Sequence, residues 1–130
     1  MHKIEIRTRA KEEFIDITPQ VQRVISSNTD QKIKHVLIFI PHTTAGLTIN
    51  ECADPTVSRD LLMALDRIVD KNWSYQHREG NAPAHVKASL LGSSLCLIVH
   101  QHRLVLGSWQ GIFMVEFDGP RQRNIYLSFS

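Results

Sequence analysis

Cysteine is scarce in this sequence, and its scarcity excludes a disulfide-stabilised scaffold. The 130 residues include two cysteines, Cys52 and Cys96. Two cysteines cannot form the dense disulfide framework of a small secreted domain, and neither has the nearby second cysteine of a zinc ribbon or a redox motif. We therefore expect both thiols to be reduced.

Long apolar runs are also missing. No apolar stretch approaches the length of a membrane span, and the segment from Met1 to Arg7 lacks the apolar core and small-residue cleavage site of a secretory signal. These absences predict a cytoplasmic protein without a membrane partner.

A large excess of charge of either sign is absent as well. The formal net charge is +2, and the basic residues are scattered among acidic ones without an aromatic and basic stripe. A nucleic-acid partner is therefore not expected. The length and the 42% of hydrophobic residues are typical of one globular domain, which we place at residues 1–130.

The apolar residues that are present indicate a mixture of strands and helices. Alternating or continuous apolar runs, many of them rich in β-branched residues, predict strands. The predicted strands are 3–7, 14–17, 35–40, 47–50, 95–99, 104–106, 112–118 and 125–129. Three segments with a cap or a first-turn proline predict helices. They begin at Thr18-Pro19, at Asp54-Pro55 and after Asn81, and the third ends near Leu91.

Some of these segments carry specific burial expectations. The runs 35–40 and 95–99 are nearly continuous in apolar residues, which predicts strands buried on both faces. In 112–118, the residues Phe113, Val115 and Phe117 fall on one face and Glu116 on the other. The helix after Pro55 shows an apolar stripe that we expect to be buried. Its members are Val57, Leu61, Leu65 and Ile68, and Leu62 and Val69 widen it.

Polar side chains concentrate between His77 and His85, where the sequence reads His-Arg-Glu-Gly-Asn-Ala-Pro-Ala-His. The run surrounds a turn at Gly80-Asn81 that leads into a helix, with Asn81 either capping the helix or forming the turn. We interpret it as one wall of a polar site. The alternative is a solvated loop with a surface histidine at each end.

A second polar cluster follows the strand 35–40, where His42, Thr43 and Thr44 come directly after Pro41. Polar side chains at the end of a buried strand are held by a rigid scaffold, as catalytic side chains commonly are.

Several motifs follow one another in a fixed order: the run His42 to Glu51, Asp54-Pro55, Tyr75 with His77, Gly80-Asn81, Ala84-His85, Leu106-Gly107 with Trp109-Gln110, and the run Glu116 to Arg121. Together they resemble the motifs of the YjbQ family, uncharacterised protein family UPF0047. The resemblance covers nearly the whole chain. It departs from the family pattern at His102, where a glycine is usual, at Ser108 and at Cys52.

This resemblance implies an α+β domain built on a strongly bent antiparallel sheet, a pseudo-barrel or sandwich with two to three helices, usually associated as a homotrimer. It also implies a secondary thiamine-phosphate synthase activity, a side reaction in a family whose main role is unsettled. That reaction joins a thiazole phosphate to a pyrimidine and releases pyrophosphate, so it needs donors for phosphate and usually a magnesium ion.

The candidate site residues follow from this chemistry. Imidazoles and a carboxylate suit acid and base roles, and hydroxyl, amide, indole and guanidinium groups suit phosphate or ring binding. The catalytic candidates are His42, His77, His85 and Glu116. The substrate-binding candidates are Thr43, Thr44, Asn81, Ser89, Trp109, Gln110 and Arg121, with a weaker case for Arg123.

Three of these assignments have open alternatives. The imidazoles of His42, His77 and His85 could instead hold a divalent metal such as Mg²⁺ or Zn²⁺. Trp109 could stack on a substrate ring or lie in the core. Glu116 sits in an apolar strand and so needs a partner, such as Arg121 or an imidazole, that could be purely structural.

Three functional hypotheses remain. The first is a homotrimer that binds a phosphorylated small molecule and weakly couples the thiamine precursors. The second is a metal-dependent hydrolase or other transferase at the same site. The third is a non-catalytic trimeric binding protein.

Overall fold

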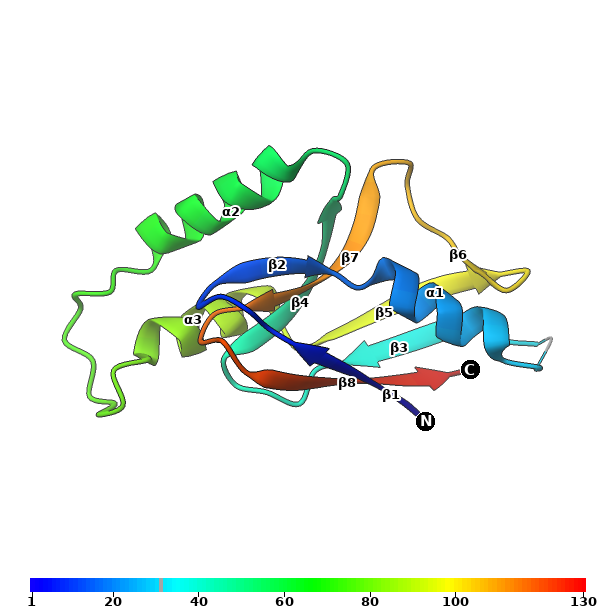
Figure 1. The fold of residues 1–130 in the computed structure, drawn as a ribbon, viewed down its shortest axis with the longest axis horizontal. Coiled ribbons are helices and arrows are strands. Elements are labelled where there is room, and N and C mark those ends of the chain that lie inside the picture. Colours follow the sequence, from blue (N-terminus) through cyan, green and yellow to red (C-terminus); the bar gives the residue numbers. More distant parts are fainter. Residues whose placement is uncertain (31) are drawn as a thin grey trace.

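Two antiparallel sheets form the framework of the molecule (Figure 1). The computed structural model describes residues 1–30 and 32–130. One sheet has the strand order β1-β8-β3-β5-β6 and the other has the order β2-β7-β4. The strands are β1 (His2–Arg7), β2 (Glu13–Asp16), β3 (His35–Phe39), β4 (Ala45–Glu51), β5 (Ser94–His100), β6 (Arg103–Leu104), β7 (Gln110–Glu116) and β8 (Gln122–Phe129).

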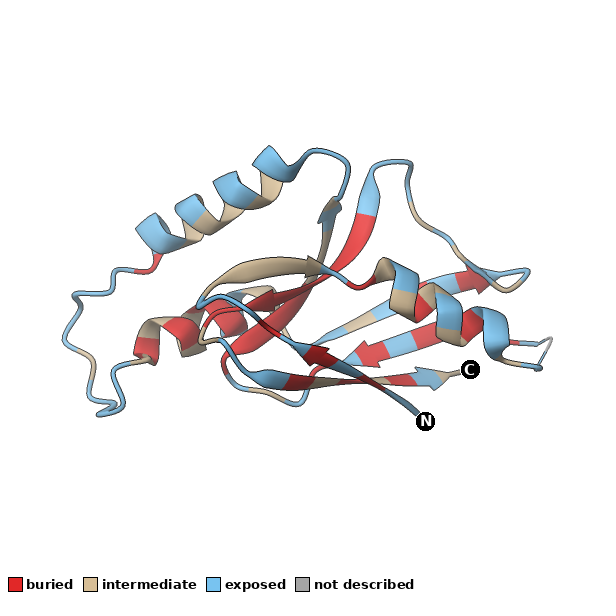
Figure 2. Ribbon diagram, in the orientation of Figure 1, coloured by how far each residue is buried: buried red, intermediate tan, exposed pale blue. Residues whose placement is uncertain are grey.

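The main core lies between the inner faces of these sheets. Strand alternation sends every second side chain inward, so that Val36 and Ile38 of β3 meet Ile125 and Leu127 of β8 in one buried cluster. Helix α1 (Thr18–Ser27) contributes buried residues to the same cluster. Figure 2 shows this alternation as bands of buried and exposed residues along β3 and β8.

Strand β7 is covered on both faces and separates the main core from a smaller one. Its Met114 belongs to the main core, whereas Phe113 and Val115 belong to a second buried cluster with Ala84 and Ala88 of α3 (Ala82–Leu91). The predicted division of this strand into two faces is therefore confirmed. Because α3 packs on β7 and β4, it brings the loop before it close to the end of β7.

The predicted burial of 35–40 and 95–99 on both faces is wrong. In β3 and β5 buried and exposed residues alternate, and Leu37, Phe39 and Ile98 are 46%, 42% and 57% exposed. The outer faces of β3 and β5 are exposed to solvent in a single chain, although they carry these three large apolar side chains. Continuous apolar sequence indicates that both faces avoid water, but it does not say whether the same chain covers them.

Helix α2 (Pro55–Ile68) begins as predicted, with Asp54 accepting a hydrogen bond from the Thr56 N–H at 2.9 Å. Its apolar stripe is buried only in part: Leu62 and Leu65 pack, partly buried, against the second cluster, and Val69, directly after the helix, is buried. None of its 14 residues, all of them described, is fully buried, and Ile68 is 62% exposed. In Figure 1 this helix extends along the outside of the molecule, so only part of its apolar face meets the rest of the chain.

Other differences from prediction concern the ends of elements. Strand β7 starts and ends two residues earlier than predicted, and the partner of β5 is the short β6 rather than 104–106. Helix α1 is not capped by Thr18, since its N-cap is Ile17 and the Thr18 hydroxyl accepts a hydrogen bond from Ile112 N–H at 2.8 Å. The hydroxyl that could have capped the helix is therefore hydrogen-bonded to β7 instead.

The predicted α+β fold with a bent antiparallel sheet is confirmed, with three helices in the described residues. None of these helices combines the length and apolar character needed to cross a membrane. Cys52 and Cys96 are both free thiols, as expected.

Candidate functional site

Three separate loops surround an open hollow of about 390 Å³, which we call the histidine hollow. One loop follows β3, the second precedes α3, and the third joins β7 to β8. Because the strands and α3 that flank them are packed in the two cores, these loops start from fixed positions. The described lining residues are Pro41, His42, Thr43, Thr44, His77, Glu79, Asn81, His85, Asp118, Arg121 and Arg123.

A buried ion pair forms the support beneath the hollow. Glu116 is fully buried, and Arg123 donates two hydrogen bonds to its carboxylate, one of them from Nε at 2.9 Å. The same guanidinium donates to Thr44 Oγ1 at 2.8 Å. Thr8 of the β1–β2 loop completes the set with a 2.8 Å hydrogen bond to Glu116 Oε1. The pair thus ties the loop after β3 to the ends of β7 and β8.

Gly119 allows these segments to meet. A Cβ atom at this position would lie 2.3 Å from the carbonyl oxygen of Ala10 and 2.8 Å from Thr8 Oγ1. Any other residue would therefore push the β1–β2 loop away from the buried carboxylate.

His42 is oriented by the backbone of β8. Its Nε2 accepts a hydrogen bond from Asn124 N–H at 2.9 Å, so the neutral ring carries its proton on Nδ1. Burial, and then the nearby charge of Arg123, lower the pKa of His42 below its ordinary value of 6.5. His42 is therefore a neutral hydrogen-bond donor at pH 7, and its Nε2 is not available to a metal.

His77 and His85 lie together on the opposite wall. Their ring centroids are 5.2 Å apart and the rings are nearly perpendicular. His77 Nε2 also lies 3.9 Å from Glu79 Oε2. The two ends of the run His77 to His85 thus converge, as the wall interpretation requires.

Asp118 and Arg121 form the rim. Arg121 donates to the Asp118 carboxylate at 2.9 Å and to its backbone oxygen at 2.7 Å, and Asn81 Nδ2 donates to the same carboxylate at 2.9 Å. Burial alone would raise the pKa of Asp118, but the bonds from Asn81 and Arg121 hold it below its ordinary range. Asn81 is the N-cap residue of α3, yet its side chain is committed to Asp118 rather than to the helix.

Several predicted site residues do not line this hollow. Among the described residues, the lining of the histidine hollow does not include Ser89, Trp109, Gln110 or Glu116. Trp109 is 65% exposed, so it does not lie in the core, and Gln110 starts β7 at the end opposite Glu116. A seven-residue strand separates them by about 20 Å. Ser89 points away and bonds to the His85 carbonyl.

Sequence reasoning also missed some contributors. Glu79 was not singled out, although it lies within the run His77 to His85. Thr8 gave no signal, because it precedes its partner Glu116 by 108 residues. Arg123 was favoured less than Arg121, although it alternates with the buried Ile125 and Leu127, and that parity places it inside.

The three histidines share the hollow without forming a ready metal site. Among the side chains that the structure describes, no group of three or more His, Cys, Asp and Glu residues is arranged to hold a metal ion. A metal here would need ligands from water or substrate, or a rearrangement of side chains.

Comparison with known proteins decides the family. A family model described as "UPF0047 protein YjbQ-like" matches residues 2–130. The chain belongs to the YjbQ family. Its relatives include UPF0047 protein MJ1081 of Methanocaldococcus jannaschii, 46% identical over 98% of this chain and 91% of that protein, and YugU of Bacillus subtilis, 45% identical over 95% and 94%.

Solved structures of this family agree with the fold. A YjbQ/UPF0047 protein from Clostridium acetobutylicum superposes with a TM-score of 0.95 at 44% identity, covering both chains completely. The conserved hypothetical protein TT1486 from Thermus thermophilus gives 0.92 at 40% identity, again over both whole chains. The names of these YjbQ relatives state no activity, so membership establishes the fold and leaves the function to be argued from the site.

Proposed function

We propose that this YjbQ protein binds a phosphorylated small molecule in the histidine hollow. The observation that carries the proposal is the convergence of His77, His85 and Arg121 on one open hollow. The Arg121 side chain is 51% exposed and uses two of its five N–H donors on Asp118, which leaves three for a ligand. The exposed Thr43 and the Nδ1–H of His42 add further donors.

The reaction we propose is the weak coupling of the thiamine precursors that the family resemblance implies. The ring nitrogen of the thiazole phosphate would bond to the methylene carbon of the pyrimidine diphosphate, and pyrophosphate would leave. Arg121 would bind phosphate, and His42 would donate a hydrogen bond to a phosphate oxygen. Glu79 and Asp118 are the carboxylates on the lining that would hold a magnesium ion, which neutralises charge on the leaving group.

Binding can be tested separately from turnover. Titration calorimetry with inorganic phosphate should show that Arg121→Ala weakens binding about 10-fold or more, because a hydrogen bond to a charged group contributes about 1.5–3 kcal/mol. Arg78→Ala is the matched control, since Arg78 is exposed in the neighbouring loop and is not among the lining residues. Equal losses in the two variants, or no binding by the native protein, would remove the proposal.

Turnover is measured with the purified protein, both precursors and magnesium. Formation of thiamine phosphate that is lost in His77→Ala supports the coupling reaction. Phosphate binding without any product would leave the third hypothesis, a non-catalytic binding protein.

The pairing of His77 with His85 favours one alternative, a metal-dependent hydrolase or transferase. Two imidazoles at this separation beside Glu79 would bind Zn²⁺ after small side-chain movements. This alternative predicts a bound transition metal in protein purified without chelator, and a melting temperature that rises when metal is added to native protein but not to His85→Ala. Purified protein that contains no metal, and whose melting temperature does not change when zinc is added, would contradict the metal-dependent alternative.

A further inference from the structure

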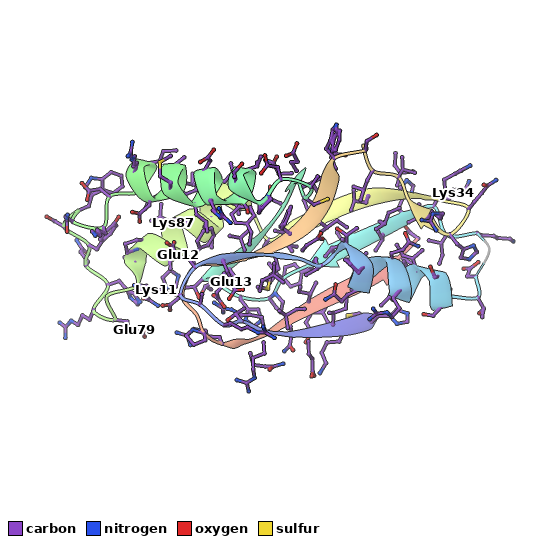
Figure 3. The ribbon with its side chains drawn as sticks, turned by 45° about the horizontal axis from the view of Figure 1, so that its top comes forward. Lys11, Glu12, Glu13, Lys34, Glu79 and Lys87 are labelled. Carbon is purple, nitrogen blue, oxygen red and sulfur yellow. The ribbon has the colours of Figure 1, made fainter. Side chains whose placement is uncertain are left out.

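A second hollow lies directly beside the first, between α3, the loop before it and the β1–β2 loop. It has a volume of about 540 Å³. Among the described lining residues, Glu79, Asn81 and Asp118 belong to both hollows. Figure 3 shows Lys11 and Glu12 from the β1–β2 loop near Lys87 of α3, with Glu79 in the adjacent loop. The two hollows are therefore adjacent, and Asn81 and Asp118, which are hydrogen-bonded to each other, belong to the lining of both.

Lys87 is the most unusual side chain of the second hollow, because it is a lysine with only 4% exposure. Its ammonium donates to Glu12 at 2.7 Å and to Asp66 at 3.2 Å. Burial alone would lower the pKa of Lys87, but these two carboxylates raise it above its ordinary value, so the group stays charged. A lysine has three N–H donors, and the partners found in the described chain use two of them.

Asn81 supplies the complementary group. Its Nδ2 donates to Asp118, whereas its Oδ1 is buried and has no hydrogen-bond partner among the described residues. A buried acceptor without a donor is costly, so this oxygen calls for a donor from outside the chain. Asn81, which belongs to the lining of both hollows, thus has an acceptor without a donor, and Lys87 has an N–H donor without an acceptor.

The charges around the second hollow argue against a second anion there. Its lining includes three lysines, Lys11, Lys71 and Lys87. It also includes four carboxylates, from Glu12, Asp66, Glu79 and Asp118, and Asp118 is already paired with Arg121, so that no positive charge is left over for an anion. A group that is uncharged and both donates and accepts hydrogen bonds fits best, and a hydroxyl group has this property.

We infer that the second hollow is a subsite for the hydroxyl-bearing part of the physiological ligand, whose phosphate occupies the histidine hollow. The inference rests on the proposed function and narrows it to sugar phosphates and similar polyol phosphates. One hydroxyl accepts a hydrogen bond from Lys87 and another donates to Asn81 Oδ1. The thiamine precursors would then be poor substitutes for the physiological ligand. This agrees with thiamine-phosphate synthesis being a side reaction.

The test compares ribose 5-phosphate with inorganic phosphate by titration calorimetry. Native protein should bind ribose 5-phosphate about 10-fold more tightly, the contribution of one hydrogen bond to a charged group. Lys87→Met should bring the two affinities close together without changing that of inorganic phosphate. Lys34→Met is the control, since Lys34 is exposed at the opposite end of the molecule in Figure 3 and should keep the full ratio.

A second variant guards against misfolding of Lys87→Met. Asn72 is an exposed lining residue, and Asn72→Trp should fill the subsite and remove the preference for ribose 5-phosphate. Equal affinities in the native protein, or an unchanged ratio in a folded subsite variant, would overturn the inference while leaving phosphate binding intact. Failure of inorganic phosphate to bind native protein would overturn the proposed function itself.

Discussion

Glu116 has no exposed surface, and its carboxylate is held by Arg123, Thr8 and the backbone N–H of Asp118. Glu116 itself is absent from the described lining of the histidine hollow, whereas Arg123 belongs to it. The role of the pair is to position the loop that carries His42, through the contacts from Arg123 to Thr44. A buried ion pair contributes little net stability as a pair, yet breaking it is costly because one charge stays buried alone.

Single and double substitutions separate these effects. We expect Glu116→Ala and Arg123→Ala each to lower the free energy of unfolding by about 3–5 kcal/mol. The double variant Glu116→Leu with Arg123→Met should lose less than either, because no charge remains buried. Urea unfolding measures all three. A double variant that loses as much as the sum of the single ones would show that the two groups act independently.

The pH dependence of the free energy of unfolding is a second test of the Glu116–Arg123 ion pair. Burial alone would raise the pKa of Glu116, but the bonds from Arg123, Asp118 and Thr8 hold it below its ordinary value of 4.5. The ionised Glu116 carboxylate therefore contributes its full stabilisation of the folded state above pH 4.5. This contribution is lost as the pH falls through the lower pKa that Glu116 has in the folded state. Glu116→Gln cannot ionise, so its stability should fall less steeply than that of native protein in this acidic range.

At this scale the sequence predicted that Glu116 needs a partner but favoured the wrong arginine. Arg121 lies in the turn before β8 and bonds to Asp118, whereas Arg123 lies on the inward face of the strand. Arg121 is exposed and Arg123 is buried, although two residues at this spacing would share a face if both lay in one strand. Alternation holds only within a strand, and Arg121 is outside it.

At the scale of elements, the exposed apolar residues of β3 and β5 form one continuous surface. Leu37 lies opposite Cys96 in the β3–β5 register, and Phe39 lies opposite Tyr126 of β8. Apolar side chains gathered on an exposed sheet face commonly mark an interface. We propose that this face is buried between copies of the chain in the homotrimer that the family resemblance implies.

A charge on this face should prevent assembly without unfolding the chain. We expect native protein to have the mass of a trimer in analytical ultracentrifugation, and Leu37→Glu or Ile98→Glu to shift it to the monomer. Met63→Glu is the control, because Met63 is 46% exposed on α2, which runs along the outside of the molecule apart from β3 and β5 in Figure 1. A monomeric native protein, or trimers that survive both charged variants, would contradict the proposed interface.

The hydropathy pattern identified these strands, but it could not show whether the same chain or another molecule covers their outer faces. Periodicity reports whether side chains avoid water, and a neighbouring molecule satisfies that requirement as well as a helix does. The same reasoning applies to the apolar stripe of α2, which was predicted correctly as a pattern but is buried only in part.

At the scale of the whole molecule, the site depends on three loops that are distant in sequence and adjacent in the fold. His42 lies beside Asn124, 82 residues away, because β3 and β8 are paired. The family resemblance supplied the fold, and the local runs supplied candidate residues. Asn81 and Arg121 line the hollow, whereas Trp109 and Gln110 do not. No local sequence signal could show this difference, because strand pairing and helix packing determine which of these residues come close together.

The most direct test is a crystal structure of the protein soaked with inorganic phosphate. The proposed function predicts a phosphate ion in the histidine hollow, within hydrogen-bonding distance of the Arg121 guanidinium and near the imidazoles of His77 and His85. Phosphate bound only elsewhere on the molecule, or a hollow that stays empty at a concentration that saturates binding in solution, would contradict it.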